Sequence, residues 1–184
     1  MNYKILVNKD NPLSKTYIPK NLVSASSQYK NNILINKQAH ESFKSMQKAA
    51  NSVGFNIDIM SGYRDYHYQE KIYNRSLQEK GYANTFRSIA KPGCSEHQTG
   101  LAIDICFYRN GLCYIEHEIE NTPELTWLKN NCVKYGFILR YPKDKEDITG
   151  YNYEPWHYRY IGSLAKTITN EALTFEEYHQ KNHL

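Results

Sequence analysis

The sequence contains no long hydrophobic run, because its apolar stretches extend over only a few residues each. Its first residues, MNYKILVNKD, show neither the apolar core of a signal peptide nor a small-residue cleavage site. A membrane-spanning helix needs about 20 consecutive apolar residues. The sequence therefore predicts no membrane span and no export signal, and we expect a cytoplasmic protein.

Cysteine pairs at metal-binding spacing are absent as well. The four cysteines, none of which forms a Cys-x-x-Cys pair, are Cys94, Cys106, Cys113 and Cys132. Their even number allows two disulfides. A chain without an export signal nevertheless favours free thiols, and we expect the cysteines to be unpaired.

A strong charge of one sign is also missing. The net charge of +4 arises from 23 basic and 19 acidic residues that form no dense basic block. This distribution argues against a nucleic-acid partner. Tyrosine, by contrast, is abundant, with 17 residues. Because tyrosine combines a large apolar area with a polar tip, it suits a binding groove as well as a core.

Length and composition are typical of one globular domain. A chain of 184 residues that is 40% hydrophobic and 23% charged can bury a sizeable core. We therefore expect a single domain over residues 1–184. The chain up to about Asn32 carries turn residues and two prolines, which predict irregular structure. Residues 1–37 are accordingly interpreted as an N-terminal arm packed on the domain.

Helices and strands are both indicated, without a regular βαβ order. The predicted helices cover residues 39–53, about 65–80, 122–132 and 174 onward, and the predicted strands read NIDIM, LAIDICF, FILRY and WHYRYI. Gly54 and Gly81 mark the ends of the first two helices, and Thr122 is the N-cap of the third. Thr174 and Glu177 match a capping box. This mixture favours an α+β fold with a small central antiparallel sheet flanked by helices.

Asp104 stands in the middle of LAIDICF, where a carboxylate is costly to bury unless it is paired or bound to a metal. His97 reaches the same region if Gly100 lets the chain turn. His157 in EPWHYRY is the best third candidate, and Glu154 lies three residues before it. Two imidazoles and one carboxylate leave a fourth position for water, which is typical of catalytic zinc. Glu154 could then take the proton of that water.

Each of these residues also has an ordinary structural interpretation. His157 could be a packing histidine, and Glu154 could be an exposed loop acid. Asp104 could cap a turn or pair with Arg64 or Arg140. Two further histidines near the C-terminus stand at helical metal-pair spacing, but their polar surroundings favour solvated side chains. Spacing alone therefore leaves zinc binding as one hypothesis among several.

The motifs around these residues resemble those of a known family. SEHQTGLAIDI fits the S-x-H-x-x-G-x-A-x-D motif, and EPWH fits the E-x-W-H motif, of the zinc D-Ala-D-Ala peptidases. SGYR and Gln69 match the same family upstream. Longer stretches are similar to the cytoplasmic VanXY-type bifunctional D,D-dipeptidase/D,D-carboxypeptidases of glycopeptide resistance: LVNKDNPL, PGCSEHQTGLAID, YGFILRYP and ITGYNYEPWHYRYIG. The motifs occur in the family's order over about residues 60 to 160, and this combination is specific.

The resemblance implies a role for each motif residue. The implied zinc ligands are His97, Asp104 and His157. Glu154 is implied as the general base that activates water and later protonates the leaving amine. Arg64 is implied to stabilise the oxyanion, a task that suits a permanently charged group with several donors. Ser95 and Gln69 are implied to bind the substrate, through its terminal carboxylate or amide. Glu96 is then interpreted as a bystander.

The resemblance also implies a fold and an activity. The fold is a compact α+β domain with a central antiparallel sheet, shared with hedgehog signalling domains and lysostaphin-type peptidases. The activity is zinc-dependent hydrolysis of the D-Ala-D-Ala dipeptide and of the terminal D-Ala of peptidoglycan-precursor pentapeptides, which removes the ends that vancomycin binds. Alternatives are a murein L,D-carboxypeptidase, an endolysin-type peptidase, or a binding domain with an idle zinc. The presence of both Glu154 and Arg64 argues against the idle site.

Overall fold

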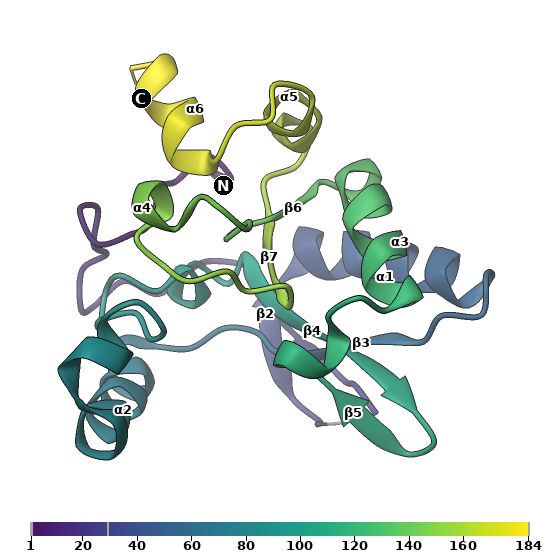
Figure 1. The fold of residues 1–184 in the computed structure, drawn as a ribbon, viewed down its shortest axis with the longest axis horizontal. Coiled ribbons are helices and arrows are strands. Elements are labelled where there is room, and N and C mark those ends of the chain that lie inside the picture. The colour runs from purple at the N-terminus through teal and green to yellow at the C-terminus, as the bar shows by residue number, and fades with distance from the viewer. Residues whose placement is uncertain (1, 29, 184) are drawn as a thin grey trace.

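The computed structural model describes residues 2–28 and 30–183 (Figure 1). Its central sheet has five strands in the order β3, β4, β7, β6, with β5 paired to β4. The strands are β3 (Ile57–Ser61), β4 (Ala102–Arg109), β5 (Leu112–Tyr114), β6 (Phe137–Leu139) and β7 (His157–Tyr160). All these pairings are antiparallel. The predicted α+β fold with a central antiparallel sheet is confirmed.

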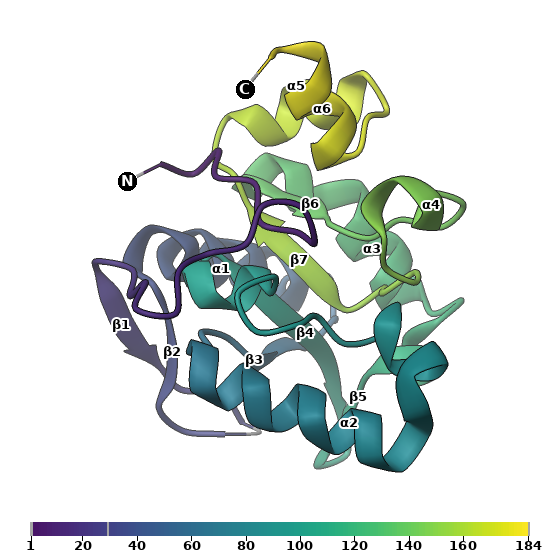
Figure 2. The same cartoon turned by 90° about the vertical axis from the view of Figure 1, so that its left-hand side faces the viewer.

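Helices cover both faces of this sheet. They are α1 (Lys37–Asn51), α2 (Tyr66–Phe86), α3 (Pro123–Asn131), α4 (Glu146–Thr149), α5 (Leu164–Asn170) and α6 (Phe175–Lys181), with short 3₁₀ turns η1 (Glu96–Thr99), η2 (Glu116–Ile119) and η3 (Cys132–Tyr135). Helices α1 and α3 lie on one side of the sheet, and α2 lies on the other (Figures 1 and 2). Among the described residues, no helix combines the length and the apolar character needed to cross a membrane.

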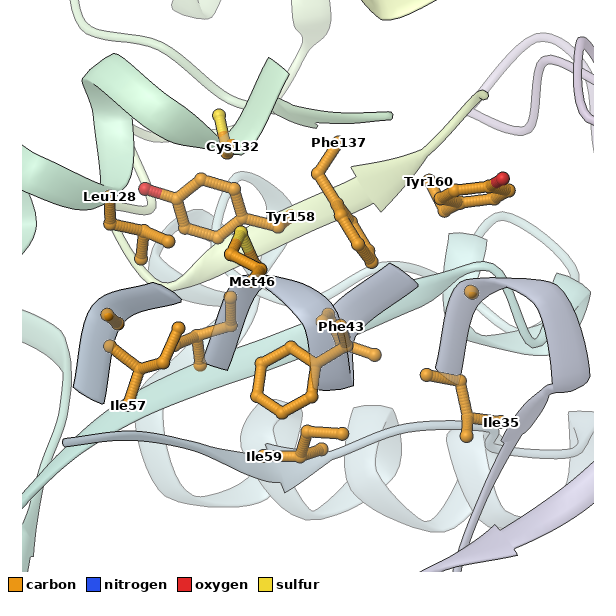
Figure 3. Packing of buried hydrophobic residues seen from close by; sticks show 14 of the residues in the cluster. Ile35, Phe43, Met46, Ile57, Ile59, Leu128, Cys132, Phe137, Tyr158 and Tyr160 are labelled. Atoms are coloured by element: carbon orange, nitrogen blue, oxygen red, sulfur yellow. The ribbon is translucent and has the colours of Figure 1, made fainter. Parts of the chain in front are cut away.

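The main core lies between α1 and the sheet (Figure 3). Phe43 and Met46 on α1 pack in the same cluster as Ile103 and Ile105 on β4, and all four are almost completely buried. Burial of each such side chain stabilises the fold by about 1.5–3 kcal/mol. Because side chains alternate along a strand, Asp104 points to the opposite face of β4. The apolar face of β4 thus builds the core, and its other face is available for a functional site.

Helix caps follow the sequence predictions. The Oγ1 of Thr122 accepts a hydrogen bond from the backbone N–H of Leu125 at 3.2 Å, at the start of α3. At the start of α6, Thr174 and Glu177 exchange side-chain to backbone hydrogen bonds of 3.1 and 2.7 Å. Both predicted N-termini are therefore confirmed, because each depends on residues close in sequence.

The N-terminal arm is more regular than predicted. Strands β1 (Leu22–Ala25) and β2 (Ile33–Asn36) form a two-stranded antiparallel sheet in which Val23 pairs with Ile35. The prediction of irregular structure up to Asn32 was therefore wrong for the first of these strands. The buried side chains of Ile33 and Ile35 pack in the main core, and this tertiary contact stabilises a segment too short to show a periodic pattern.

Helix α2 also extends beyond the predicted end at Gly81. Gly81 has a positive φ of 72°, which ends the first helical run as expected, but the chain resumes helical geometry and continues to Phe86. A buried hydrogen bond of 2.8 Å between the hydroxyls of Ser76 and Thr85 joins the two parts. This contact explains why the chain folds back into a helix after the glycine kink.

The expectation of four free thiols was wrong for two of them. Cys106 on β4 and Cys113 on β5 form a disulfide, with their Cα atoms 5.9 Å apart. Cys94 and Cys132 are free and buried. The pairing depends on the register of β4 and β5, in which Cys113 lies opposite Tyr108. Cysteine count and spacing alone do not contain that register.

Candidate metal centre and active site

A buried group of three potential metal ligands lies where β4, β7 and η1 meet. Asp104 and His157 stand opposite each other in neighbouring antiparallel strands. His97 reaches them from η1, and Gly100, with a φ of +69°, turns the chain from η1 into β4 as predicted. A side chain at Gly100 would also collide with Leu22. One ligand atom from each of His97, Asp104 and His157 lies within 4.8 Å of the other two.

The donor atoms of this group fit a zinc ion. Nδ1 of His97 donates to the carbonyl oxygen of Gly62 at 2.6 Å, because that oxygen can only accept. Nε2 of His97 therefore carries a lone pair; it is buried without a hydrogen-bond partner and lies 3.3 Å from Oδ1 of Asp104. Nδ1 of His157 lies 3.2 Å from the same oxygen. Two imidazole nitrogens and one carboxylate form the donor set of open, catalytic zinc sites.

The electrostatics of the group favour a bound cation. Burial and the nearby Arg64 lower the pKa of His97 to about 4, so its ring is neutral near pH 7, the form that binds metals. For His157, burial opposes protonation, but the nearby carboxylates of Asp104 and Glu96 outweigh it and raise its pKa to about 9. Burial alone would raise the pKa of Asp104, yet the two histidines hold it well below its usual range. The carboxylates thus stabilise positive charge here.

Glu154 and Arg64 lie beside these three residues. Oε2 of Glu154 is 3.7 Å from Nδ1 of His157, and its side chain is only 13% exposed. Burial raises the pKa of Glu154 to about 7, against the opposing effect of His157. A carboxyl group with such a pKa can both accept and return a proton near neutral pH. On the other side, Nη1 of Arg64 lies 3.6 Å from Oδ2 of Asp104.

A cavity of about 740 Å³ borders the group. Its lining includes the site residues Arg64, Asp104, Glu154 and His157 and the aromatic residues Tyr63, Tyr68, Tyr153 and Trp156. Segment 108–121 contributes Ile115 and Glu116, and segment 142–152 contributes Asn152. Both segments therefore border the site. A cavity of this size and mixed polar and aromatic lining suits a short peptide.

Ser95 and Gln69 are buried but do not belong to the described lining of the cavity. The amide nitrogen of Gln69 donates to the carbonyl oxygen of Ala90 at 2.8 Å. The amide oxygen of Gln69 is buried without a hydrogen-bond partner, so it remains available as an acceptor. The substrate-binding roles of both residues stay predictions.

Glu96 is not a bystander. Its side chain is completely buried, and Oε1 accepts hydrogen bonds of 2.8 Å from Nε of Arg140 and from Nη1 of Arg159. Burial alone would raise the pKa of Glu96, but the two guanidinium groups hold it far below its usual range. Arg140 therefore pairs with Glu96, whereas Asp104 pairs with Arg64. The missed signal was one arginine in each of the predicted apolar strands FILRY and WHYRYI, since a buried charge needs an acidic partner.

Comparison with known proteins links this arrangement to peptidases. A family model described as VanY, D-alanyl-D-alanine carboxypeptidase, matches residues 32–163. YodJ of Bacillus subtilis, a carboxypeptidase by name, is 41% identical over 98% of this chain and 68% of its own length. The bifunctional D-Ala-D-Ala dipeptidase and D-Ala-D-Ala carboxypeptidase VanXYC of Enterococcus gallinarum is 37% identical over 97% of this chain and 94% of its own length.

Solved structures of similar proteins cover nearly the whole chain. The LdcB LD-carboxypeptidase has a TM-score of 0.88 and 42% identity, over 96% of this chain and 85% of its own. A mutant of the vancomycin-resistance D,D-pentapeptidase VanY in complex with Zn(II) has a TM-score of 0.81 and 36% identity, over 97% and 99%. VanYB in complex with D-alanine-D-alanine has a TM-score of 0.82 and 36% identity, over 97% of both chains.

Proposed function

The chain belongs to the VanY family of D-alanyl-D-alanine carboxypeptidases, and from this premise we propose that it is a zinc-dependent D,D-peptidase. Its substrates are the D-Ala-D-Ala dipeptide and the terminal D-Ala of peptidoglycan-precursor pentapeptides. The observation that carries the proposal is the buried group of His97, Asp104 and His157 beside Glu154, at the wall of a peptide-sized cavity. The zinc-bound and the D-Ala-D-Ala-bound VanY structures support the choice of metal and substrate.

Each residue of the site has its own role in the proposed reaction. His97, Asp104 and His157 hold the ion, which when bound acidifies a water molecule and polarises a carbonyl group. Glu154 takes a proton from the attacking water at its carboxylate and delivers it to the leaving amine. Its raised pKa of about 7 suits both transfers. Arg64 donates hydrogen bonds to the carbonyl oxygen, on which negative charge develops.

Binding of the substrate is assigned to Ser95 and Gln69, in line with the motif resemblance. The unpartnered amide oxygen of Gln69 can accept a hydrogen bond from a peptide N–H. Hydrolysis of both substrates depletes the D-Ala-D-Ala ends that vancomycin binds. We therefore propose a role in glycopeptide resistance and a cytoplasmic location, which fractionation of the producing cells would check.

The direct test is the release of D-Ala. Zinc-loaded protein is incubated with the D-Ala-D-Ala dipeptide and, separately, with a precursor pentapeptide, and free D-Ala is measured. The Glu154→Ala variant should bind zinc normally and release none. Absence of D-Ala release from both substrates by the wild-type protein would contradict the proposed function. Full activity of the variant would contradict the assignment of the base alone.

A second candidate is an L,D-carboxypeptidase. The similarity to LdcB, with a TM-score of 0.88 and 42% identity, favours it. The two functions differ in the stereochemistry of the residue before the scissile bond, so a tetrapeptide ending in L-Lys-D-Ala separates them. Release of D-Ala from the tetrapeptide, without release from the pentapeptide or dipeptide, would establish this alternative in place of the D,D-peptidase.

A further inference from the structure

Glu96 lies beside the ring of His157, near the nitrogen that does not face Asp104. One of its oxygens, Oε1, is occupied by Arg140 and Arg159. The other, Oε2, is buried without a hydrogen-bond partner and lies 3.6 Å from Nε2 of His157, which is also buried without one. The opposite ring nitrogen of His157, Nδ1, faces Asp104. A buried carboxylate oxygen and a buried imidazole nitrogen thus lie next to each other, and neither has a hydrogen-bond partner in the described part of the chain.

The position of the ring proton decides which nitrogen of a histidine can bind a metal. A neutral imidazole carries one N–H donor and one lone pair, and a carboxylate on one side fixes the donor there. Ligating histidines generally donate their second N–H to a carboxylate or a carbonyl oxygen. His97 follows this rule, because the carbonyl of Gly62 fixes its proton on Nδ1.

We propose that Glu96 is a positioning residue that keeps the proton of His157 on Nε2 and so directs the Nδ1 lone pair toward Asp104. The inference rests on the proposed metal centre and assigns a part of it that the ligand set does not include. The two histidines then bind through different nitrogens, His97 through Nε2 and His157 through Nδ1. Each is fixed by its own acceptor, Gly62 or Glu96.

The surroundings hold Glu96 in this orientation. Arg140 is anchored on its other side by two hydrogen bonds to Glu176 of α6. Arg159 donates to the carbonyl oxygens of Tyr3 and Ile5 in the N-terminal arm, at 3.2 and 2.7 Å. Because both arginines bind Oε1, the carboxylate cannot rotate without breaking these bonds. Oε2 is therefore kept for His157.

Replacement of Glu96 by glutamine separates positioning from packing. The amide has nearly the same shape but only one acceptor oxygen, which the two arginines require. Its NH₂ group then points at Nε2 of His157 and favours a proton on Nδ1, where it blocks metal binding. We expect Glu96→Gln to weaken zinc binding about 10- to 100-fold, the usual effect of losing such an acceptor. Competition with a chromophoric chelator measures this change, and the absorption spectrum of the Co²⁺-loaded protein should change with it.

Glu176→Gln is the matched control. It removes the other acidic partner of Arg140, and in the described part of the chain the hydrogen bonds of Glu176 join it to Arg140 and Asn8 rather than to His157. It should lower the unfolding temperature and leave the affinity for zinc and the Co²⁺ spectrum unchanged. The proposal fails if Glu96→Gln binds zinc as tightly as the wild type. It also fails if Glu176→Gln lowers the affinity for zinc as much as Glu96→Gln does.

A measurement on the wild-type protein covers the case in which Glu96→Gln does not fold. In the zinc-loaded protein, ¹H–¹⁵N correlation spectra of the histidine rings should place the proton of His157 on Nε2. A proton on Nδ1 would overturn the inference while leaving zinc binding, and the proposed function, intact. Failure of the wild-type protein to bind zinc would overturn both.

Discussion

Replacement of Arg64 by methionine tests the proposed stabilisation of the oxyanion. Arg64 lines the cavity with its side chain 22% exposed, and its Nη1 lies 3.3 Å from Oγ of Ser61 and 3.6 Å from Oδ2 of Asp104. Its Nε is buried without a hydrogen-bond partner. The guanidinium therefore has donor capacity left beside the site. A methionine fills similar space but provides neither donor nor charge.

The expected effects on turnover and on metal binding differ in sign. Loss of one oxyanion donor costs about 10²- to 10³-fold in kcat, or about 2.7–4 kcal/mol of transition-state stabilisation. The positive charge of Arg64 next to Asp104 opposes a second cation at the same carboxylate. Its removal should thus leave zinc affinity unchanged or increase it. Arg64→Lys keeps the charge without the planar fork and should fall between the wild type and Arg64→Met.

The assay measures kcat for D-Ala release at saturating zinc, together with the dissociation constant for zinc. Arg75→Met, at an exposed position on α2, serves as the control for loss of one positive charge. A kcat for Arg64→Met close to that of the wild type would refute the oxyanion role. Weaker zinc binding in the same variant would show that Arg64 acts through the ligands instead.

Three further predictions concern stability and thiol chemistry. With zinc at 1,000 times its dissociation constant as the reference, removal of zinc should lower the free energy of unfolding by about 4 kcal/mol. Calorimetry should then show a Tm lower by roughly 8–16 °C. Phe43→Ala should destabilise the protein by about 3–5 kcal/mol in urea, whereas Thr174→Ala should cost about 1 kcal/mol; equal losses would contradict this difference between core and cap. In denaturant, thiol titration should count the two free cysteines before reduction and all four afterwards, and four at the start would exclude the disulfide between Cys106 and Cys113.

Local sequence determined the elements whose causes lie within a few residues. Thr122 and the Thr174–Glu177 box start helices because their side chains cap nearby backbone N–H groups. The alternation around Asp104 predicted a strand with one apolar face, and Gly100 supplies the positive φ of the turn before it. The candidate ligands were predicted on the same grounds, since a carboxylate inside an apolar strand requires a partner.

Tertiary structure decided the features that depend on strand register and on distant partners. The disulfide, the β1–β2 pair and the return of α2 after Gly81 all join segments whose spacing in sequence gives no sign of contact. The surroundings of Glu96 also depend on tertiary structure, although the sequence led us to interpret it as a bystander beside His97. Only folding brings Arg140 and Arg159 to one side of its carboxylate and His157 to the other. The role of a buried charged side chain depends on the groups that surround it in space, and its neighbours along the chain do not reveal those groups.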